Sequence, residues 1–217
     1  VHESSWGSAT VFFPVNRDQE FKQTSHELQL SSDSDGPLNY VAGLYYMDAD
    51  SFITSGPIQP FTVNHSAEAM AVYGELTYDF NELWSLTLGA RYTDEDKEMN
   101  SFSWPPVVGD ADRLAGNTDP GVLLNSGNPT FSDDNLSYRI VLARDLSFGM
   151  AYASFSTGFR SGGFFNRGSV PAELEPYDSE EVASFELGLR TNPTNNTQLN
   201  LTLYSAEYTD MQLPVIT

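Results

Sequence analysis

The chain has 217 residues, of which 40% are hydrophobic, so it can bury enough apolar surface to fold and is not expected to be disordered. Ten lysines and arginines against 30 aspartates and glutamates give a net charge of -20, which excludes a nucleic-acid-binding surface because phosphate contacts need clustered cations. The absence of cysteine excludes disulfides, thiolate metal ligands and thiol catalysis.

Alternation of polar with small or apolar residues is the dominant pattern along the chain. It is clear from Trp84 to Thr93 and from Ala151 to Arg160, where successive side chains differ in polarity with a period of two. This pattern predicts β-strands whose two faces meet different surroundings. About eight strands are expected, near residues 19–31, 37–50, 66–79, 83–97, 132–144, 148–160, 178–190 and 197–211.

Short and long connections alternate between these strands. Tight turns are expected at "SDSDG", "NE", "LS" and "TNPTNN", and long loops at 51–65, 98–131 and 161–177. Strands of about 12–15 residues exceed the about 5–6 residues usual in soluble sandwiches. Outer-membrane barrels have both features. The sequence therefore predicts an all-β fold in which residues 1–217 form part of one antiparallel, up-and-down transmembrane β-barrel domain.

The two sets of alternating side chains predict which face meets lipid. The apolar set is expected on the outward face, against outer-membrane lipid, and the polar set toward the lumen. The outward set comprises Leu86, Leu88, Ile140, Leu142, Phe155, Phe185, Leu187, Leu201 and Leu203. Luminal arginines at 91, 139, 160 and 190, with Glu75 and Glu186, are expected to form networks on the wall or to contact a domain in the lumen.

Four stretches carry a resemblance to a known family. "TSHELQLSS…GPLNYVAGLYY", "AVYGELTYDFNELWSLTLGARYTDEDK", "MAYASFSTGFRSGGFF" and "SEEVASFELGLRT…LNLTLYSAEYTDMQ" resemble, in this order and spacing, the barrel of TonB-dependent outer-membrane receptors. The resemblance extends from about Thr24 to Gln212. It implies a barrel of about 22 strands around a plug domain in the bacterial outer membrane. It also implies uptake of a scarce ligand, such as an iron-siderophore, cobalamin or a carbohydrate, driven by the TonB complex.

The chain departs from that family in ways that affect its architecture. Eight strands are about a third of such a barrel, and the sequence shows neither a plug domain nor a TonB-box segment. We therefore expect an open sheet whose edges pair with strands outside these residues. The alternative is a self-contained small barrel, structural or porin-like, in which residues 20–30 and 198–210 pair with each other.

Aromatic and basic residues in the long connections are the candidate ligand-binding residues. They are Phe102 and Trp104 in "SFSWPP" and Arg160, Phe164 and Phe165 in "GFRSGGFF". Gly162 and Gly163 are expected to permit backbone turns that other residues disfavour. The aromatic residues either face a ligand entering from outside or pack one loop against another, and the sequence leaves both readings open.

No catalytic or metal-binding motif stands out. The histidines, His2, His26 and His65, lack the spacing of metal ligands, and we expect neither enzymatic activity nor a resident cofactor. An outer-membrane protease or lipase would need a catalytic set at the rim, where His65 is the nearest histidine. Acidic clusters either hold calcium on the loops or hydrate them. Their members are Asp94, Glu95, Asp96, Glu98, Asp133, Asp134, Glu173, Glu175, Asp178, Glu180 and Glu181.

Overall fold

A single open antiparallel sheet accounts for almost all of the chain. The computed structural model describes residues 15–32, 34–57, 60–104, 125–165, 174–194 and 196–213. The strands are β1 (Val15–Ser31), β2 (Leu38–Pro57), β3 (Phe61–Asn81), β4 (Trp84–Ser103), β5 (Asn125–Gly127), β6 (Thr130–Leu146), β7 (Gly149–Arg160), β8 (Glu180–Thr194) and β9 (Thr197–Thr209). No helix in this described part of the chain is both long and apolar enough to span a membrane.

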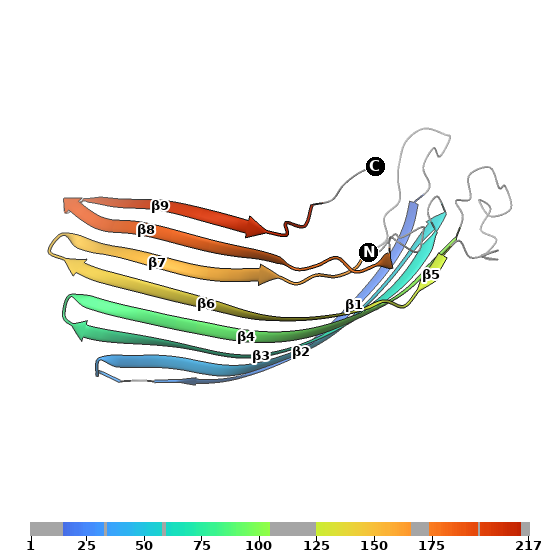
Figure 1. Cartoon of the computed structure of the whole chain (residues 1–217), viewed down its shortest axis with the longest axis horizontal. Coiled ribbons are helices and arrows are strands. Elements are labelled where there is room, and N and C mark those ends of the chain that lie inside the picture. Colours follow the sequence, from blue (N-terminus) through green and yellow to red (C-terminus); the bar gives the residue numbers. More distant parts are fainter. Residues whose placement is uncertain are drawn as a thin grey trace.

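The strands follow one another across the sheet in chain order. The order is β1-β2-β3-β4-β6-β7-β8-β9, and every pairing is antiparallel. The short β5 pairs with the C-terminal end of β4. The turns that join β1 to β2, β3 to β4, β6 to β7 and β8 to β9 lie at one end, on the left of Figure 1. The predicted eight long strands with next-neighbour pairing are therefore confirmed.

The sheet does not close within the described residues. There β1 pairs with β2 alone and β9 with β8 alone. The two strands lie on opposite sides of the curved sheet in Figure 1. The ladder between residues 20–30 and 198–210 that a self-contained small barrel requires is thus missing from the part of the chain that the structure describes, as the open-sheet prediction expected.

The predicted long loop at 51–65 is wrong. Strand β2 continues to Pro57 and β3 begins at Phe61, so only a short connection separates them. Similarly, β4 continues to Ser103 and β5 pairs with its end, inside the predicted loop 98–131. Near these strand ends the outward face is polar, as at Asn64 and Glu98, and the apolar side chains, such as Val63 and Met99, lie on the opposite face, so the outward apolar set that marks the rest is missing. The backbone ladder continues where that side-chain pattern stops.

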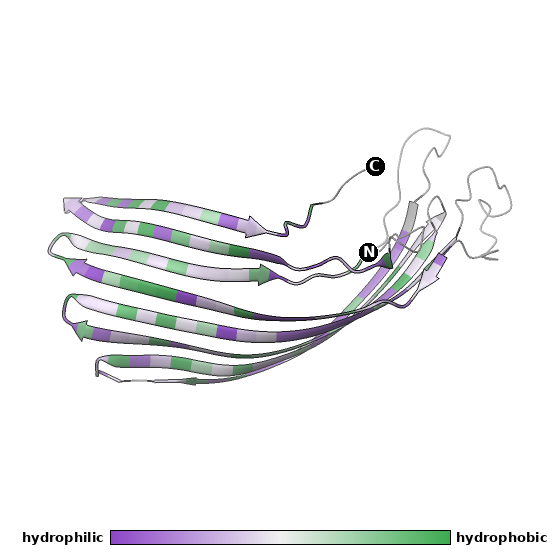
Figure 2. Cartoon of the chain, viewed as in Figure 1, coloured by the Kyte–Doolittle hydropathy of each residue, from purple (hydrophilic) through white to green (hydrophobic). Residues whose placement is uncertain are grey.

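The register places the two predicted side-chain sets on opposite faces. Leu88 pairs with Ile140, Ile140 with Phe155 and Phe155 with Phe185, so these residues share one face. Arg91, one position away from that alternation, pairs with Tyr73 and Ser137 on the other face. Figure 2 shows hydrophobic and hydrophilic residues alternating along the strands accordingly. We call the face of Arg91 the inner face and the face of Leu88 the outer face.

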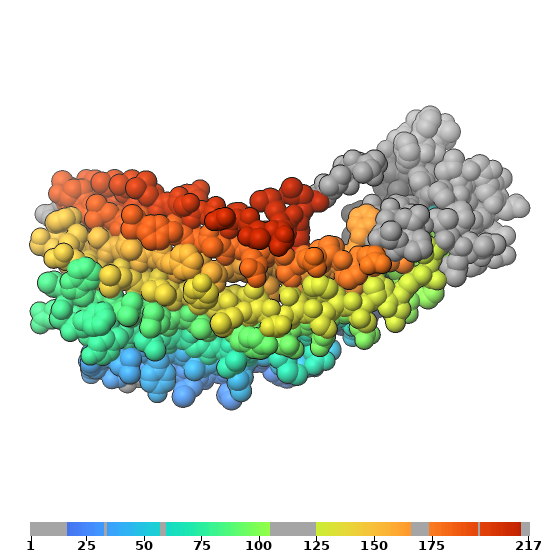
Figure 3. Space-filling view, viewed as in Figure 1, coloured from blue at the N-terminus to red at the C-terminus, as the bar shows by residue number. Residues whose placement is uncertain are grey.

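Within the described residues, the large buried apolar side chains form one cluster, near the long connections. Figure 3 shows the strands side by side in chain order, from blue and green to yellow and red. The apolar cluster consists of Phe61, Val63, Met99, Phe164 and Leu174, with Ile53 and Phe131 packed against it. By contrast, outer-face residues such as Leu28 and Leu203 are 71% and 64% exposed. A sheet with so little core needs an apolar surrounding for its outer face.

Leu88→Arg tests the lipid-facing assignment of the outer face. Leu88 is 38% exposed on β4. If it contacts lipid near the bilayer centre, a charge there lowers the free energy of unfolding by about 2–4 kcal/mol. Urea titration of the protein refolded into lipid vesicles, followed by tryptophan fluorescence, measures this loss.

The matched control is Thr87→Arg, one residue away on the inner face. It removes the hydroxyl contact of Thr87 with Thr77, 2.9 Å long, and should cost only about 1 kcal/mol. Equal losses in the two variants would contradict the assignment of faces.

Candidate functional site

Two chain segments fold over the inner face at the end of the sheet opposite the tight turns. Residues 161–165 leave β7, and residues 174–179 lead into β8. They pair with each other through an isolated bridge in which the Gly163 N–H donates to the Tyr177 carbonyl over 3.1 Å and the Tyr177 N–H to the Gly163 carbonyl over 2.8 Å. We call them the inner segments.

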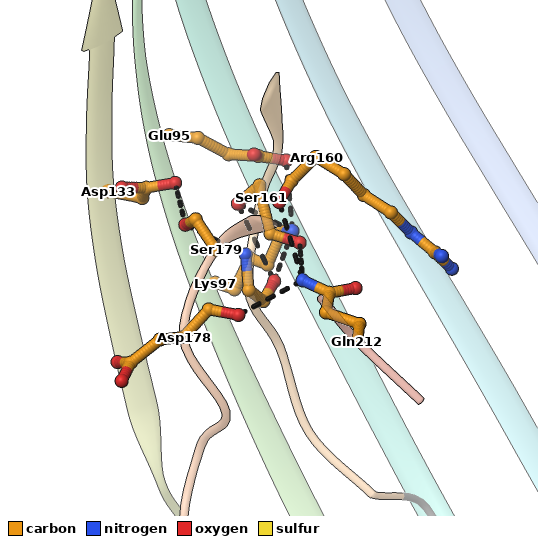
Figure 4. Close-up of polar contacts among 9 residues, drawn as sticks. Glu95, Lys97, Asp133, Arg160, Ser161, Asp178, Ser179 and Gln212 are labelled. Atoms are coloured by element: carbon orange, nitrogen blue, oxygen red, sulfur yellow. Dashed lines mark hydrogen bonds and ion pairs between the residues drawn. The ribbon is translucent and has the colours of Figure 1, made fainter. Parts of the chain in front are cut away.

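Lys97 ties the first inner segment to the wall. From the inner face of β4, its ammonium donates to Ser161 Oγ over 3.0 Å and to the Gly162 carbonyl over 2.8 Å. It also pairs with Glu95 Oε1 at 3.4 Å (Figure 4). The two side chains are only 20% and 15% exposed, so water screens this contact less than it would on an open surface. The three donors of the ammonium therefore each have a partner.

Ser179 ties the second inner segment to β6. Its hydroxyl accepts the Gly162 N–H over 3.2 Å and donates to Asp133 Oδ2. This serine links both inner segments to one carboxylate on the wall, as Figure 4 shows. The Asp133 carboxylate therefore has a structural role, because it anchors both inner segments to β6 through Ser179.

The inner segments also bring apolar side chains to the wall. Phe164 and Leu174 are 7% and 6% exposed and complete the apolar cluster with Val63 and Met99. The Phe164 ring also contacts the His65 ring, with centroids 5.7 Å apart. Burying side chains of this size contributes about 1.5–3 kcal/mol each. Apolar burial thus supports the inner segments together with the polar contacts.

A cavity of about 630 Å³ lies beside the first inner segment. Its lining includes Phe21, His65, Lys97, Arg160, Phe164 and Tyr177. The guanidinium of Arg160 points away from the polar contacts around Lys97 in Figure 4, and it makes no hydrogen bond or ion pair with any described residue. The cavity thus combines aromatic surface, the carboxylates of Asp50 and Glu95, and a guanidinium that has no partner among the described residues.

The rest of the inner face carries networks of arginine, tyrosine and acid. Arg91 lies over the rings of Tyr45 and Tyr73, 5.3 and 5.6 Å from their centroids. The Tyr73 hydroxyl donates to Glu27 over 2.5 Å, and its ring crosses Gly43, where a Cβ would lie 2.4 Å from the ring.

The same arrangement recurs on β7 and β8. There the Tyr152 ring crosses Gly188, its hydroxyl donates to Glu186, and Arg190 lies 5.6 Å from the ring centroid. Arg139 pairs with Glu75 at 3.7 Å. The expected wall networks are therefore present around Arg91, Arg139 and Arg190, but among the described residues none includes the guanidinium of Arg160.

The sequence-predicted ligand residues do not all meet at the cavity. Arg160 and Phe164 line it, whereas Phe165 is 53% exposed beside it. Phe102 pairs with Thr62 and Ser126 on the outer-face register. The backbone N–H of Trp104 donates to the Pro60 carbonyl. A ligand role for any of these residues stays a prediction.

Sequence reasoning missed Lys97 and Ser179. Lys97 was detectable as the single cation within the acidic run "TDEDKE". For Ser179 no local signal exists, since its partner Asp133 lies 46 positions away.

The glycines of the first inner segment act through space rather than through an unusual backbone angle. Among the described glycines, Gly149 is the one with a positive φ. The prediction that Gly162 and Gly163 adopt backbone angles that other residues disfavour is therefore wrong. A Cβ on Gly162 would lie 2.2 Å from the Tyr177 carbonyl oxygen. Glycine is needed there because the two inner segments approach so closely.

The acidic residues do not form a metal centre within the described ranges. No group of three or more histidine, aspartate or glutamate side chains there could hold a metal ion. Glu173 and His2 lie outside the described residues. Calcium bound by the loops stays a prediction.

Comparison with known proteins identifies the family. A profile described as "TonB dependent receptor-like, beta-barrel" matches residues 2–217. The chain belongs to this family. Receptors of this family are bacterial outer-membrane proteins and transporters rather than enzymes, which places the protein in the outer membrane. No curated protein matches it in sequence.

Two solved receptor structures share its fold. The ferric yersiniabactin uptake receptor FyuA from Yersinia pestis is 20% identical with a TM-score of 0.78, over 93% of this chain and 31% of that one. The Ferric-Catecholate import receptor Fiu from K12 E. coli is 12% identical with a TM-score of 0.60, over 89% of this chain and 32% of that one. The chain spans about a third of each receptor.

Gly162→Ala tests the close packing of the inner segments. The new methyl group would meet the Tyr177 carbonyl oxygen and, at 2.5 Å, the ring of Phe131. Overpacking of this kind costs about 1–3 kcal/mol and should raise the fraction of detached segment about fivefold or more. Trypsin should then cleave after Arg160 correspondingly faster.

Gly158→Ala is the control. A Cβ there would meet only Val182 Cγ1, at an ordinary 3.5 Å, so cleavage after Arg160 should match that of the parent. If Gly162→Ala also matches the parent, the inner segments are not closely packed.

Proposed function

We propose that the protein is a TonB-dependent receptor that takes up a scarce small molecule, and that an iron-siderophore is its ligand class. The observation that carries this proposal is the cavity between the inner segments and the wall, lined by aromatic rings and by Arg160. The family supports the transport class, and the cavity supports the ligand class.

The chemistry of the cavity favours an anionic, aromatic ligand over a carbohydrate. Tyr177, 44% exposed, offers a ring face, the buried Phe164 adds apolar surface behind it, and Arg160 offers a guanidinium without a partner among the described residues. Ferric complexes of aromatic siderophores often present both negative charge and planar rings, which such groups recognise. FyuA and Fiu, whose structures share this fold, are receptors for ferric yersiniabactin and a ferric catecholate. Cobalamin and carbohydrates remain the other ligand classes of the proposal.

Energy coupling in this proposal requires a plug domain in the lumen and the TonB complex. The arginine and tyrosine networks on the inner face, around Arg91 and Arg190, offer polar groups for contact with a plug. Lipid would cover the outer face. The proposal assigns no enzymatic step to the chain.

The self-contained small barrel is the second candidate, and the open sheet disfavours it. Such a barrel would leave no strand edge unpaired, yet β1 and β9 do not pair in the described residues. In hydrocarbon each unpaired backbone group costs several kcal/mol. Pairing with further strands removes that cost, as the receptor reading requires.

A binding panel tests the proposed ligand class. Purified receptor in detergent would be titrated with ferric yersiniabactin, a ferric catecholate, cobalamin and a maltose oligosaccharide, and tryptophan fluorescence would report binding. We expect a ferric complex to bind best. Arg160→Ala should weaken its affinity about tenfold or more because a charged contact is lost, and Arg160→Lys should retain part of it.

Lys22→Ala is the matched control for the loss of a cation. Lys22 is exposed on β1 and pairs with Glu20 at 2.7 Å, and it is not among the lining residues, although its neighbours Phe21 and Asp50 are. Its removal should leave the affinity unchanged. Binding of cobalamin or the oligosaccharide alone would replace the proposed ligand class, and unchanged affinity in Arg160→Ala would remove Arg160 from the site.

A further inference from the structure

The chain turns sharply where β9 ends. Asp210 follows the last residue of the strand and has a φ of 54°, in the left-handed region that aspartate tolerates better than most residues. This turn directs the next residues toward the inner segments. Gln212 thereby leaves the line of β9 and reaches the ends of β7 and β8.

The side chain of Gln212 binds three backbone carbonyls. Its amide nitrogen donates to the carbonyl of Asp178 over 3.0 Å, of Ser161 over 3.2 Å and of Arg160 over 3.3 Å (Figure 4). An amide has two hydrogens, so at least one of them is shared between acceptors. The backbone N–H of Gln212 also donates to Glu180 Oε2 over 2.8 Å.

These carbonyls lie where the ladder between β7 and β8 ends. Arg160 and Glu180 form its last pair, and beyond them the inner segments pair again only at the isolated bridge between Gly163 and Tyr177. The carbonyls of Arg160, Ser161 and Asp178 lie at the end of this ladder or between it and the bridge, where the regular cross-strand hydrogen bonds are interrupted and another donor can satisfy them. Gln212 supplies donors to both chains, on the Arg160–Ser161 side and on the Asp178 side.

We propose that Gln212 is a positioning residue that holds the two inner segments together and so fixes the wall of the ligand cavity. It acts through Arg160, Phe164 and Tyr177, which line that cavity, and its effect on ligand affinity rests on the proposed function. Because Gln212 lies just after the end of β9, one side chain joins this end of β9 to both inner segments. Gln212 is also the final residue of the "YTDMQ" motif, which gives that motif a physical role.

Two substitutions separate hydrogen-bond donation from side-chain size. Gln212→Glu keeps the shape, removes both donors and places a carboxylate against three carbonyl oxygens. Gln212→Lys supplies three donors from an ammonium and should restore contact with the carbonyls. Gln198→Glu introduces the same change at an exposed position near the opposite end of β9 and serves as the control.

Hydrogen exchange measured by mass spectrometry on the full receptor reports the position of the inner segments without any ligand. In Gln212→Glu, amides of residues 161–165 and 174–179 should exchange about tenfold faster or more, because several bonds are lost at once. Gln212→Lys and Gln198→Glu should exchange at close to the parent rate. Exchange in β3 and β4 should not change in any variant.

Affinity for a ferric catecholate and for ferric yersiniabactin is measured in parallel. Gln212→Glu should weaken binding of whichever complex the parent receptor binds, and Gln212→Lys should recover it, with the thermal unfolding midpoint unchanged throughout. Parent-like exchange in Gln212→Glu would overturn the positioning role, as would faster exchange throughout the sheet. Local opening with unchanged affinity would overturn the link to the cavity. Local opening in a receptor that binds neither complex would support the positioning role and contradict the proposed ligand class.

Discussion

Backbone pairing is the constraint on which the rest of this structure depends. A strand in hydrocarbon has no water to satisfy its N–H and C=O groups, so each group must bond to a neighbouring strand. The long, continuous ladders satisfy this requirement, including the ladder between β2 and β3, strands of 20 and 21 residues. With the backbone satisfied in this way, the side chains of the outer face can be apolar without forming a core. The inner face is then free to carry charge.

The candidate site arises where that pairing ends. After Arg160 and Glu180 the ladder between β7 and β8 stops, and the two chains fold over the inner face. Their polar groups bond instead to Lys97, Ser179 and Gln212, while Phe164 supplies apolar contact. The cavity lies beside the first of these chains, and its lining includes Lys97, Gly162 and Phe164. Binding groups and structural bonds therefore share the same short stretch of chain.

Low sequence identity with preserved fold has a physical basis in this architecture. FyuA and Fiu share the fold at 20% and 12% identity. An outer face needs only apolar side chains and an inner face only polar or small ones, so many residues serve at each position. Close contacts are more demanding, as where Tyr152 crosses Gly188 or where Gly162 meets Tyr177. Identity that survives is expected at such contacts rather than along the strands.

The sequence by itself determined the strands, their order and their faces, because a period of two assigns each side chain to one side of a sheet and turn residues mark the reversals. It also marked Arg160 and Phe164 through the glycine-aromatic stretch. The tertiary structure alone decided that the ladder between β2 and β3 extends to Ser55 and Phe61, since the outer face turns largely polar there and apolar side chains lie on the inner face instead, without ending the backbone bonds. It alone brought Lys97 to Gly162 and Gln212 to Ser161, across 65 and 51 positions. Such contacts depend on the register and curvature of the whole sheet, which no local pattern encodes.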